Sequence, residues 1–126
     1  MKPPAAKVVV IDDDESVRKA LRRLIRSAGW AVATHASAEE FLSTAAQPSP
    51  GCLILDVRLP GMSGLDLQRL LAASGRDVSV VVITAHDDPA ARRAALDAGA
   101  VDFILKPFER GRLLAAVEKA LSRAAV

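Results

Sequence analysis

Five short apolar runs alternate along this chain with segments whose apolar residues recur at helical spacing. The runs are rich in Val, Ile and Leu and are bounded by polar or turn residues, so they predict buried strands of a parallel sheet. The predicted strands are Lys7–Asp12, Ala31–His35, Cys52–Asp56, Ser79–Thr84 and Asp102–Leu105. The predicted helices are about Glu15–Ala28, Ala38–Ala46, Leu65–Ser74, Ala90–Ala98 and Arg110–Arg123.

Capping and stop residues support several of these helix boundaries. Gly29 ends the first helix, and Ser37 with Glu40 predicts a capping box at the start of the second. Asp88 followed by Pro89 predicts the N-cap and the first position of the fourth helix.

Strict alternation of strand and helix predicts an α/β fold with helices on both faces of one sheet. Right-handed crossovers leave few strand orders, of which 2-1-3-4-5 is the five-stranded one. The expected fold is therefore a flavodoxin-like, doubly wound sheet of five parallel strands flanked by five helices. Residues 1–126 are expected to form a single domain with an ordered core of about residues 7–123.

Composition excludes several other classes of protein. With 51% hydrophobic and 25% charged residues in 126, the chain reads as one soluble globular domain. The apolar runs fall short of the roughly 20 residues that span a membrane, and the N-terminus lacks a signal-peptide pattern. The single cysteine, Cys52, permits no internal disulfide, so a cytoplasmic location is expected. A net charge of +2 gives no argument for nucleic-acid binding.

Charged side chains close three of the apolar runs. Asp12 and Asp13 end the first, Asp56 ends the third, and Lys106 follows the fifth. Because the carboxyl ends of neighbouring parallel strands meet at one edge of the sheet, we expect these side chains to share a crevice. The acids there suit a divalent cation and the lysine suits an anion, so phosphate bridged by Mg²⁺ would satisfy both.

The chain resembles the response-regulator receiver domains of two-component signalling from Lys7 to about Arg123. The resemblance rests on IDDDESVRKAL, LILDVRLPGMSGLDL, VVITAHDD and GAVDFILKPF, which occur in this order. HDD, AGAVDFILKPF and SAEEFL are most similar to the FixJ-like subgroup. This resemblance implies a bacterial signalling domain, not an enzyme, that takes a phosphoryl group from a histidine kinase.

The resemblance also implies a role for each acid in the crevice. Asp56 matches the phosphoacceptor, and an aspartate carboxylate can form an acyl phosphate when a metal neutralises the phosphoryl oxygens. Asp13 matches the direct Mg²⁺ ligand, Asp12 the acid that holds a metal-bound water, and the backbone carbonyl of Arg58 a further ligand. Asp14 is expected to lie outside the site or to cap the first helix. Since clustered carboxylates repel one another, at least one should have a raised pKa.

The remaining matches concern phosphoryl binding and switching. Thr84 matches the hydroxyl that donates to the phosphoryl group, with Ala85 beside it, and Lys106 matches the ammonium that pairs with that group. The resemblance implies a cis bond before Pro107. It also implies a two-state switch in which Thr84 moves toward the phosphoryl group and Phe103 rotates inward. A static Phe103 in the core is the alternative.

Two residues near the crevice are expected to tune the lifetime of the acyl phosphate. Arg58 and His86 lie two residues after Asp56 and Thr84, and in receivers these positions flank the phosphoryl group. The alternative is that both side chains are exposed and without effect. His35 is expected to be a surface or strand-edge residue rather than a ligand.

Basic residues on the first helix predict a docking surface for the sensor histidine kinase. Arg18, Lys19, Arg22, Arg23 and Arg26 recur along its outer face. Their charge would steer encounter with the kinase, and Arg22 and Arg26 are the positions chosen to test this. A solvated helix face without a partner is the alternative.

The expected output is phosphorylation-dependent homodimerisation through the fourth helix, the fifth strand and the fifth helix, where Arg92, Arg93 and Asp102 offer charges. FixJ-like receivers usually precede a DNA-binding helix-turn-helix domain, and no such output domain is expected within these 126 residues. DNA contact is expected only through such a domain. The sequence leaves open a stand-alone regulator or a receiver from a longer transcription factor.

Three other functions compete with a phosphorylated receiver. Asp12 and Asp14 resemble the nucleophile motif of haloacid-dehalogenase-type phosphatases, with Asp12 as nucleophile, but that motif leaves Asp56 unexplained and needs an acidic pair after Lys106. A flavin-binding electron carrier of this topology is disfavoured, because the acidic loop after the first strand would repel the flavin phosphate. A pseudo-receiver that only binds partners would not need the full set of acids, Thr84 and Lys106.

Overall fold

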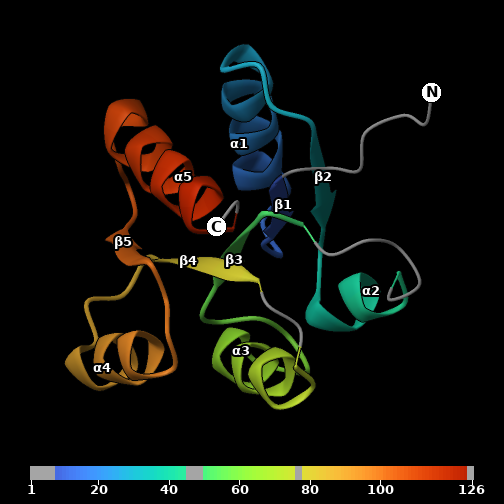
Figure 1. The fold of residues 1–126 in the computed structure, drawn as a ribbon, viewed down its shortest axis with the longest axis vertical. Helices are drawn as coiled ribbons and strands as arrows, with labels where there is room; N and C mark the ends of the chain where they lie inside the picture. The colour runs from blue at the N-terminus through green and yellow to red at the C-terminus, as the bar shows by residue number, and fades with distance from the viewer. Residues whose placement is uncertain (1–7, 45–49, 76–77, 125–126) are drawn as a thin grey trace.

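The computed structural model describes residues 8–44, 50–75 and 78–124, which form one sheet with helices on both faces (Figure 1). The strands are β1 (Val8–Ile11), β2 (Val32–His35), β3 (Cys52–Asp56), β4 (Ser79–Thr84) and β5 (Asp102–Leu105). The helices are α1 (Glu15–Ser27), α2 (Ala38–Leu42), α3 (Gly64–Ala73), α4 (Pro89–Asp97) and α5 (Arg110–Ala124). All neighbouring strands are parallel, in the order β2-β1-β3-β4-β5, which confirms the predicted fold.

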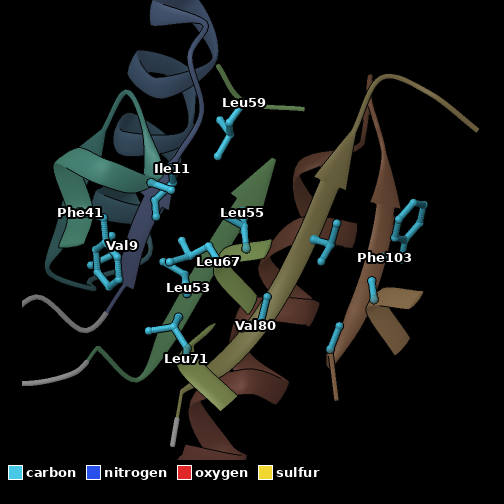
Figure 2. Close-up of a cluster of buried hydrophobic side chains, with 14 residues drawn as sticks. Val9, Ile11, Phe41, Leu53, Leu55, Leu59, Leu67, Leu71, Val80 and Phe103 are labelled. Carbon is cyan, nitrogen blue, oxygen red and sulfur yellow. The ribbon is translucent and has the colours of Figure 1, made fainter. Parts of the chain in front are cut away.

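The two faces of the sheet are covered by different helices. Helices α1 and α5 lie on one face, and α2, α3 and α4 lie on the other (Figure 1). Successive side chains of a strand point to opposite faces, so each strand contributes to both cores. Val8, Val10 and Ile54 pack in the cluster of α1 and α5. Val9 and Leu53 pack in the cluster of α2, α3 and α4, which Figure 2 shows.

Helix α2 is shorter than predicted. The prediction ran from Ala38 to Ala46, whereas the helix ends at Leu42 and residues 45 and 46 lie outside the described ranges. The Ser43 hydroxyl donates to the carbonyl of Glu40, and the Thr44 hydroxyl donates to that of Phe41. Such side chains compete with the helical hydrogen bonds of the backbone and favour termination.

The other boundaries lie close to the predictions. Strand β1 begins at Val8, because Lys7 lies outside the described residues, and it ends before Asp12. Strand β2 starts at Val32 rather than Ala31. The other three strands match, and α1, α3, α4 and α5 differ from their predicted ends by at most a residue. Within the described ranges, no helix is both long enough and apolar enough to cross a membrane.

The helix caps follow the sequence signals, with one exception. Asp88 accepts hydrogen bonds from the amides of the first turn of α4, and Pro89 is the first helical residue. Ser37 accepts from the amide of Glu40, as predicted. The reciprocal half of the capping box is replaced, because the Glu40 carboxylate lies 3.2 Å from Nδ1 of His35. His35 is thus a residue of the edge strand, as expected.

Candidate functional site

The predicted crevice forms where β1, β3, β4 and β5 end. Their register pairs Ile11 with Leu55 and Thr84 with Leu105, so the residues that close these strands lie at one edge of the sheet. Asp12 and Asp56 continue the side-chain alternation that faces α1 and α5. Lys106 follows β5 in the same phase, whereas Thr84 is in the phase of Val80 and Val82, toward α3 and α4.

Lys106 bridges the two buried acids of the crevice. Its Nζ lies 2.7 Å from Oδ2 of Asp12 and 3.2 Å from Oδ2 of Asp56. Asp12 is 0% exposed and Asp56 6% exposed, so both charges are removed from most of the solvent. The bond between Lys106 and Pro107 is cis. The sequence-predicted acids and lysine therefore meet, although Asp12 and Lys106 are 94 residues apart.

Both side-chain oxygens of Asp12 are engaged. Oδ2 accepts from Lys106, and Oδ1 accepts from the amide of Asp14 at 2.9 Å. The backbone carbonyl of Asp12 accepts from Nη1 of Arg18 at 2.8 Å. The Asp14 carboxylate caps α1 by accepting from the amides of Ser16 and Val17, which confirms the expected capping role. Asp12 is thus held rigidly, and Asp14 points away from the crevice into the helix start.

The electrostatic balance of the crevice acts in opposite directions on its acid and its base. Burial, followed by repulsion from Asp12, raises the pKa of Asp56 even though Lys106 opposes the shift. Burial alone would lower the pKa of Lys106, but the hydrogen bonds and charges of Asp12 and Asp56 outweigh it and raise that pKa. The prediction that one clustered carboxylate has a raised pKa is confirmed. The crevice carries more negative charge than one ammonium balances.

Three carboxylates could hold a metal ion here. Asp12, Asp13 and Asp56 each offer an oxygen, and these atoms lie within 4.8 Å of one another. Asp13 is exposed, so its carboxylate is open to an incoming ion. Hard oxygen donors suit Mg²⁺ or Ca²⁺, and a small set of carboxylates suits Mg²⁺, which keeps several of its waters. The donor set therefore fits a hard divalent cation.

The backbone after β3 closes around Asp56. The amide of Arg58 donates to Oδ1 of Asp56 at 3.2 Å, while the Arg58 side chain is exposed. The amide of Gly64 donates to the carbonyl of Val57 at 3.0 Å, which draws the start of α3 against the strand end. A Cβ on Gly64 would overlap the carbonyl oxygen of Asp56, so this position requires glycine. Gly64 was not singled out from the sequence, although it closes the motif that carries Asp56.

Thr84 ends β4, Ala85 and His86 follow it, and Phe103 lies on the neighbouring strand β5. Thr84 is 2% exposed, and its hydroxyl oxygen accepts from the amide of His86 at 3.2 Å. Ala85 and His86 are exposed. Phe103 is 5% exposed and belongs to the same core cluster as Ala95 of α4. Figure 2 shows its ring on β5. The hydroxyl thus lies one strand from Asp56 and on the same sheet face as Phe103.

This geometry matches a known family over most of the chain. The family model of the response regulator receiver domain matches residues 8–118. The chain belongs to this family. Receiver domains are signalling domains rather than enzymes, so membership of this family supports the predicted receiver over the alternative of a phosphatase.

The similar proteins place this receiver near the FixJ-like subgroup. It is 43% identical over 123 residues to the transcriptional regulatory protein FixJ of Azorhizobium caulinodans, covering 98% of this chain and 58% of FixJ. It is 44% identical over 124 residues to the response regulator protein TodT of Pseudomonas putida, covering 98% of this chain and 55% of TodT. The receiver thus spans about half the length of the curated relatives it matches.

Solved structures agree on the fold. The crystal structure of FixJ-N superposes with a TM-score of 0.86 at 41% identity, covering 95% of this chain and 96% of that one. The BeF3-activated DrrB receiver domain superposes with a TM-score of 0.83 at 29% identity, covering 95% of this chain and all of that one. The FixJ-like resemblance noted in the sequence is confirmed.

The position of Asp14 also counts against the phosphatase alternative. That alternative assigned Asp12 as the nucleophile in a motif that includes Asp14. Asp14 instead caps α1 by accepting from the amides of Ser16 and Val17, so its carboxylate does not face the crevice.

The basic run on α1 divides into two parts. Arg22, Arg23 and Arg26 are exposed, as predicted. Lys19 is exposed too and pairs with Glu15 at 3.1 Å. Arg18 was grouped with them, but its guanidinium turns to the carbonyl of Asp12 and supports the loop after β1. It is therefore part of the crevice rather than of the outer face.

The charges expected on the α4–β5–α5 face are largely paired within the chain. Arg112 of α5 forms two hydrogen bonds with the Asp102 carboxylate, one of them 2.8 Å from Nη2 to Oδ1. Arg93 lies 3.7 Å from the carboxylate of Asp97 on the same helix. Arg112 could not be singled out from the sequence, because its partner Asp102 lies on another element 10 residues away.

Proposed function

We propose that this chain is a phosphorylation-activated receiver in which Asp56 accepts a phosphoryl group from a histidine kinase. A carboxylate oxygen of Asp56 forms the new bond to phosphorus as the bond between phosphorus and the histidine nitrogen breaks, and the histidine then takes up a proton. The observation that carries the proposal is the joining of Asp56, Asp12 and Asp13 with Lys106 in one crevice.

Mg²⁺ is the proposed cofactor. Asp13, Asp56 and the backbone carbonyl of Arg58 would hold it directly, and Asp12 through a water. When bound, it neutralises phosphoryl oxygens and aligns the transfer. Asp13 is exposed whereas Asp12 is fully buried, which supports direct binding by Asp13 and an indirect role for Asp12. Proteins of this class work in the cytoplasm, and we propose the same location here.

Lys106 and Thr84 are proposed to bind the phosphoryl group. Lys106 already contacts Asp56, so its ammonium is placed to pair with an oxygen of the new phosphoryl group. The Thr84 hydroxyl would donate to another oxygen. In the structure its oxygen accepts from the amide of His86, which leaves its proton free for donation in this role. Ala85 follows Thr84 at the rim and would lie beside the phosphoryl group.

Labelling with a small phosphodonor tests the assignment of Asp56. Acetyl phosphate and Mg²⁺ are added, and the modified peptide is mapped by mass spectrometry. Label on Asp56, and none in Asp56→Asn, is expected. Asp14→Asn is the matched control, because it removes the same charge from a neighbouring helix cap while asparagine still caps. Label on Asp12 would contradict the proposal.

Phe103 is proposed to act as the switch aromatic that follows Thr84. The two side chains share a sheet face, which supports a common motion. Phe103→Ala should uncouple phosphorylation from dimerisation without abolishing phosphorylation. A Phe103→Ala protein that still dimerises on phosphorylation would show that Phe103 is a static core residue.

The side chains of Arg58 and His86 are proposed to tune the lifetime of the acyl phosphate. Both are exposed beside the crevice, where they could contact the phosphoryl group or an attacking water. The measurement is the dephosphorylation half-life of Arg58→Ala and His86→Ala against wild type. Unchanged half-lives in both would sink this role.

The kinase is proposed to dock beside the crevice. An apolar groove of about 420 Å³ runs between α1 and the segment after β5. Val17, Leu21 and Leu24 line it from α1, and Pro107 and Phe108 line it from the other side. A helix with an apolar stripe suits such a groove. The groove adjoins Lys106, so a docked helix would bring its phosphohistidine toward Asp56.

The basic residues of α1 would steer this encounter. Arg22 and Arg26 lie on the exposed surface of α1. Reversing both charges, in Arg22→Glu/Arg26→Glu, should slow transfer from the kinase but leave acetyl phosphate labelling intact. Equal loss in both assays would refute docking through this face.

The proposed output is a phosphorylation-dependent homodimer through the α4–β5–α5 face. Leu96 and Leu105 are exposed there, at 42% and 39%, beside the exposed Arg92. Size-exclusion chromatography with and without beryllofluoride tests it, and an unchanged monomer would count against it. Relatives named as transcriptional regulators are about twice as long, so we propose that DNA is reached only through an output domain outside these residues.

A further inference from the structure

A carboxylate from α2 reaches the loop that follows the proposed phosphoacceptor. Oε2 of Glu39 accepts a hydrogen bond of 2.9 Å from the backbone amide of Met62. The two residues are 23 positions apart, and Met62 lies in the loop between β3 and α3. Neither residue belongs to the crevice, and the family resemblance gave Glu39 no role.

The loop backbone passes tightly against this carboxylate. Gly61, next to Met62, has a φ of +73°. A Cβ built on Gly61 would come within 2.5 Å of Oε2 of Glu39. The positive φ favours glycine at this position. The absence of a side chain on Gly61 also lets the Glu39 carboxylate lie close to the loop backbone.

The held segment carries backbone that borders the crevice. At its start, the amide of Arg58 donates to Asp56 at 3.2 Å. At its end, Gly64 packs directly against the carbonyl of Asp56. Leu59 anchors the middle by being buried in the core (Figure 2). Glu39 holds the tip, so the path of the loop is set at four points.

We propose that Glu39 is a positioning residue for metal binding and phosphoryl transfer, because it holds the β3–α3 loop in the conformation that places the Arg58 backbone beside Asp56. This inference rests on the proposed function of the crevice. Glu39 touches neither the phosphoryl group nor the metal. It acts through the Met62 amide, in the way that outer partners orient metal ligands.

The bond also has an electrostatic signature. The backbone amide of Met62 is the main cause that lowers the pKa of Glu39. When pH is varied, the NMR chemical shift of the Met62 amide should therefore follow the titration of one carboxylate. The midpoint of that titration should lie below the ordinary pKa of glutamate. Loss of this titration in Glu39→Gln would assign it to Glu39.

Three variants separate positioning from a general effect on the fold. Glu39→Ala removes the acceptor, and Glu39→Gln retains a neutral one. Glu40→Ala is the matched control, because it removes the same charge from the next residue of α2, whose carboxylate contacts His35 and not the loop. Urea unfolding of all three reports any change in overall stability.

The first measurement needs no metal or phosphoryl donor. Hydrogen exchange of the Met62 amide should be about tenfold faster in Glu39→Ala, as expected when a hydrogen bond to a charged group is lost. It should be intermediate in Glu39→Gln and unchanged in Glu40→Ala. Exchange of core amides should be equal in all proteins.

The second measurement tests the consequence for the site. The affinity for Mg²⁺, measured from the NMR chemical shifts of the loop amides during a Mg²⁺ titration, should fall about tenfold in Glu39→Ala. The rate of acetyl phosphate labelling should fall by a similar factor. Glu39→Gln should recover part of both. If Glu39→Ala and Glu40→Ala bind Mg²⁺ and label alike, or if losses merely track urea stability, the positioning role is overturned. If no protein is labelled on Asp56, the proposed function fails, while Mg²⁺ affinity and Met62 exchange still decide the role of Glu39.

Discussion

Two aspartates of this chain each bond to a cation, yet their pKa values shift in opposite directions. The Asp102 carboxylate accepts hydrogen bonds from Nη1 and Nη2 of Arg112, and this pairing is the largest cause that lowers the pKa of Asp102. Asp56 bonds to Lys106, yet burial and the nearby Asp12 raise its pKa. A cation alone therefore does not decide the charge state of an acid.

The difference lies in solvent and in the second acid. The Asp102 pair is partly exposed and matches one negative charge to one positive charge. In the crevice, one ammonium serves two buried carboxylates, and Asp13 adds a third acid nearby. The crevice is thus short of positive charge, which makes it receptive to a divalent cation. The Asp102 pair is complete and ties β5 to α5.

Among the variants compared, loss of the Lys106 ammonium from the crevice should have the largest effect on stability. Lys106→Ala leaves Asp12 and Asp56 facing each other in a buried site, and should lower the free energy of unfolding by about 2–3 kcal/mol at pH 7. Adding Asp56→Asn should restore more than half of this loss. Urea unfolding of the two single variants and the double variant gives the coupling. Simple additivity would mean that the two residues do not interact.

Mg²⁺ should have the next largest effect, because it supplies the missing charge. At a concentration ten times its dissociation constant, it should stabilise the wild type by about 1.4 kcal/mol. Thermal unfolding with Mg²⁺ and with a chelator measures this. Asp13→Asn should lose most of the gain, and Arg112→Ala should keep it. If Mg²⁺ stabilised Asp13→Asn as much as wild type, the metal would have to bind at a site that does not include Asp13.

Asp56→Asn should stabilise the metal-free protein by about 1 kcal/mol at pH 7, since it removes a buried, repelled charge. A raised folded-state pKa means that wild type binds this proton more tightly when folded. The penalty of the ionised Asp56 therefore appears as pH rises through the folded pKa and is absent below the unfolded value. The advantage of the variant should shrink on acidification. A constant advantage from pH 3 to 8 would contradict this.

The smallest effect is expected for the Asp102 pair. Arg112→Ala should cost no more than about 0.5 kcal/mol at pH 7, because an exposed pair is screened by solvent. The sign with pH is opposite to that of Asp56. A lowered folded pKa gives stability above the unfolded pKa, and this is lost as pH falls through the folded value. Urea unfolding from pH 7 to 3 should show wild type and variant converge.

Residues at strand ends could be predicted from the sequence, whereas contacts between distant charged side chains could not. The sequence placed Asp12, Asp13, Asp56, Thr84 and Lys106 together because each lies at the end of a predicted strand, and strand order follows from local pattern and handedness. The Arg18 contact with Asp12 was missed, because basic residues spaced along a helix look alike until a loop is placed against one of them. The end of α2 was missed for a similar reason, since alanines after Leu42 favour helix while Ser43 and Thr44 compete with it.

The sequence by itself determined the alternating strands and helices, their order in the sheet, and the edge where the acids and the lysine meet. These features follow from the periodicity of apolar residues, from the burial that this periodicity implies, and from the handedness of the chain. All three depend on short stretches of sequence. Only the tertiary structure decided which charges share a bond. The bridge from Lys106 to Asp12 and Asp56, the pairing of Arg112 with Asp102, and the hold of Glu39 on Met62 join groups distant in sequence. Long polar side chains have many rotamers and several possible partners, so their choice is fixed by packing rather than by pattern.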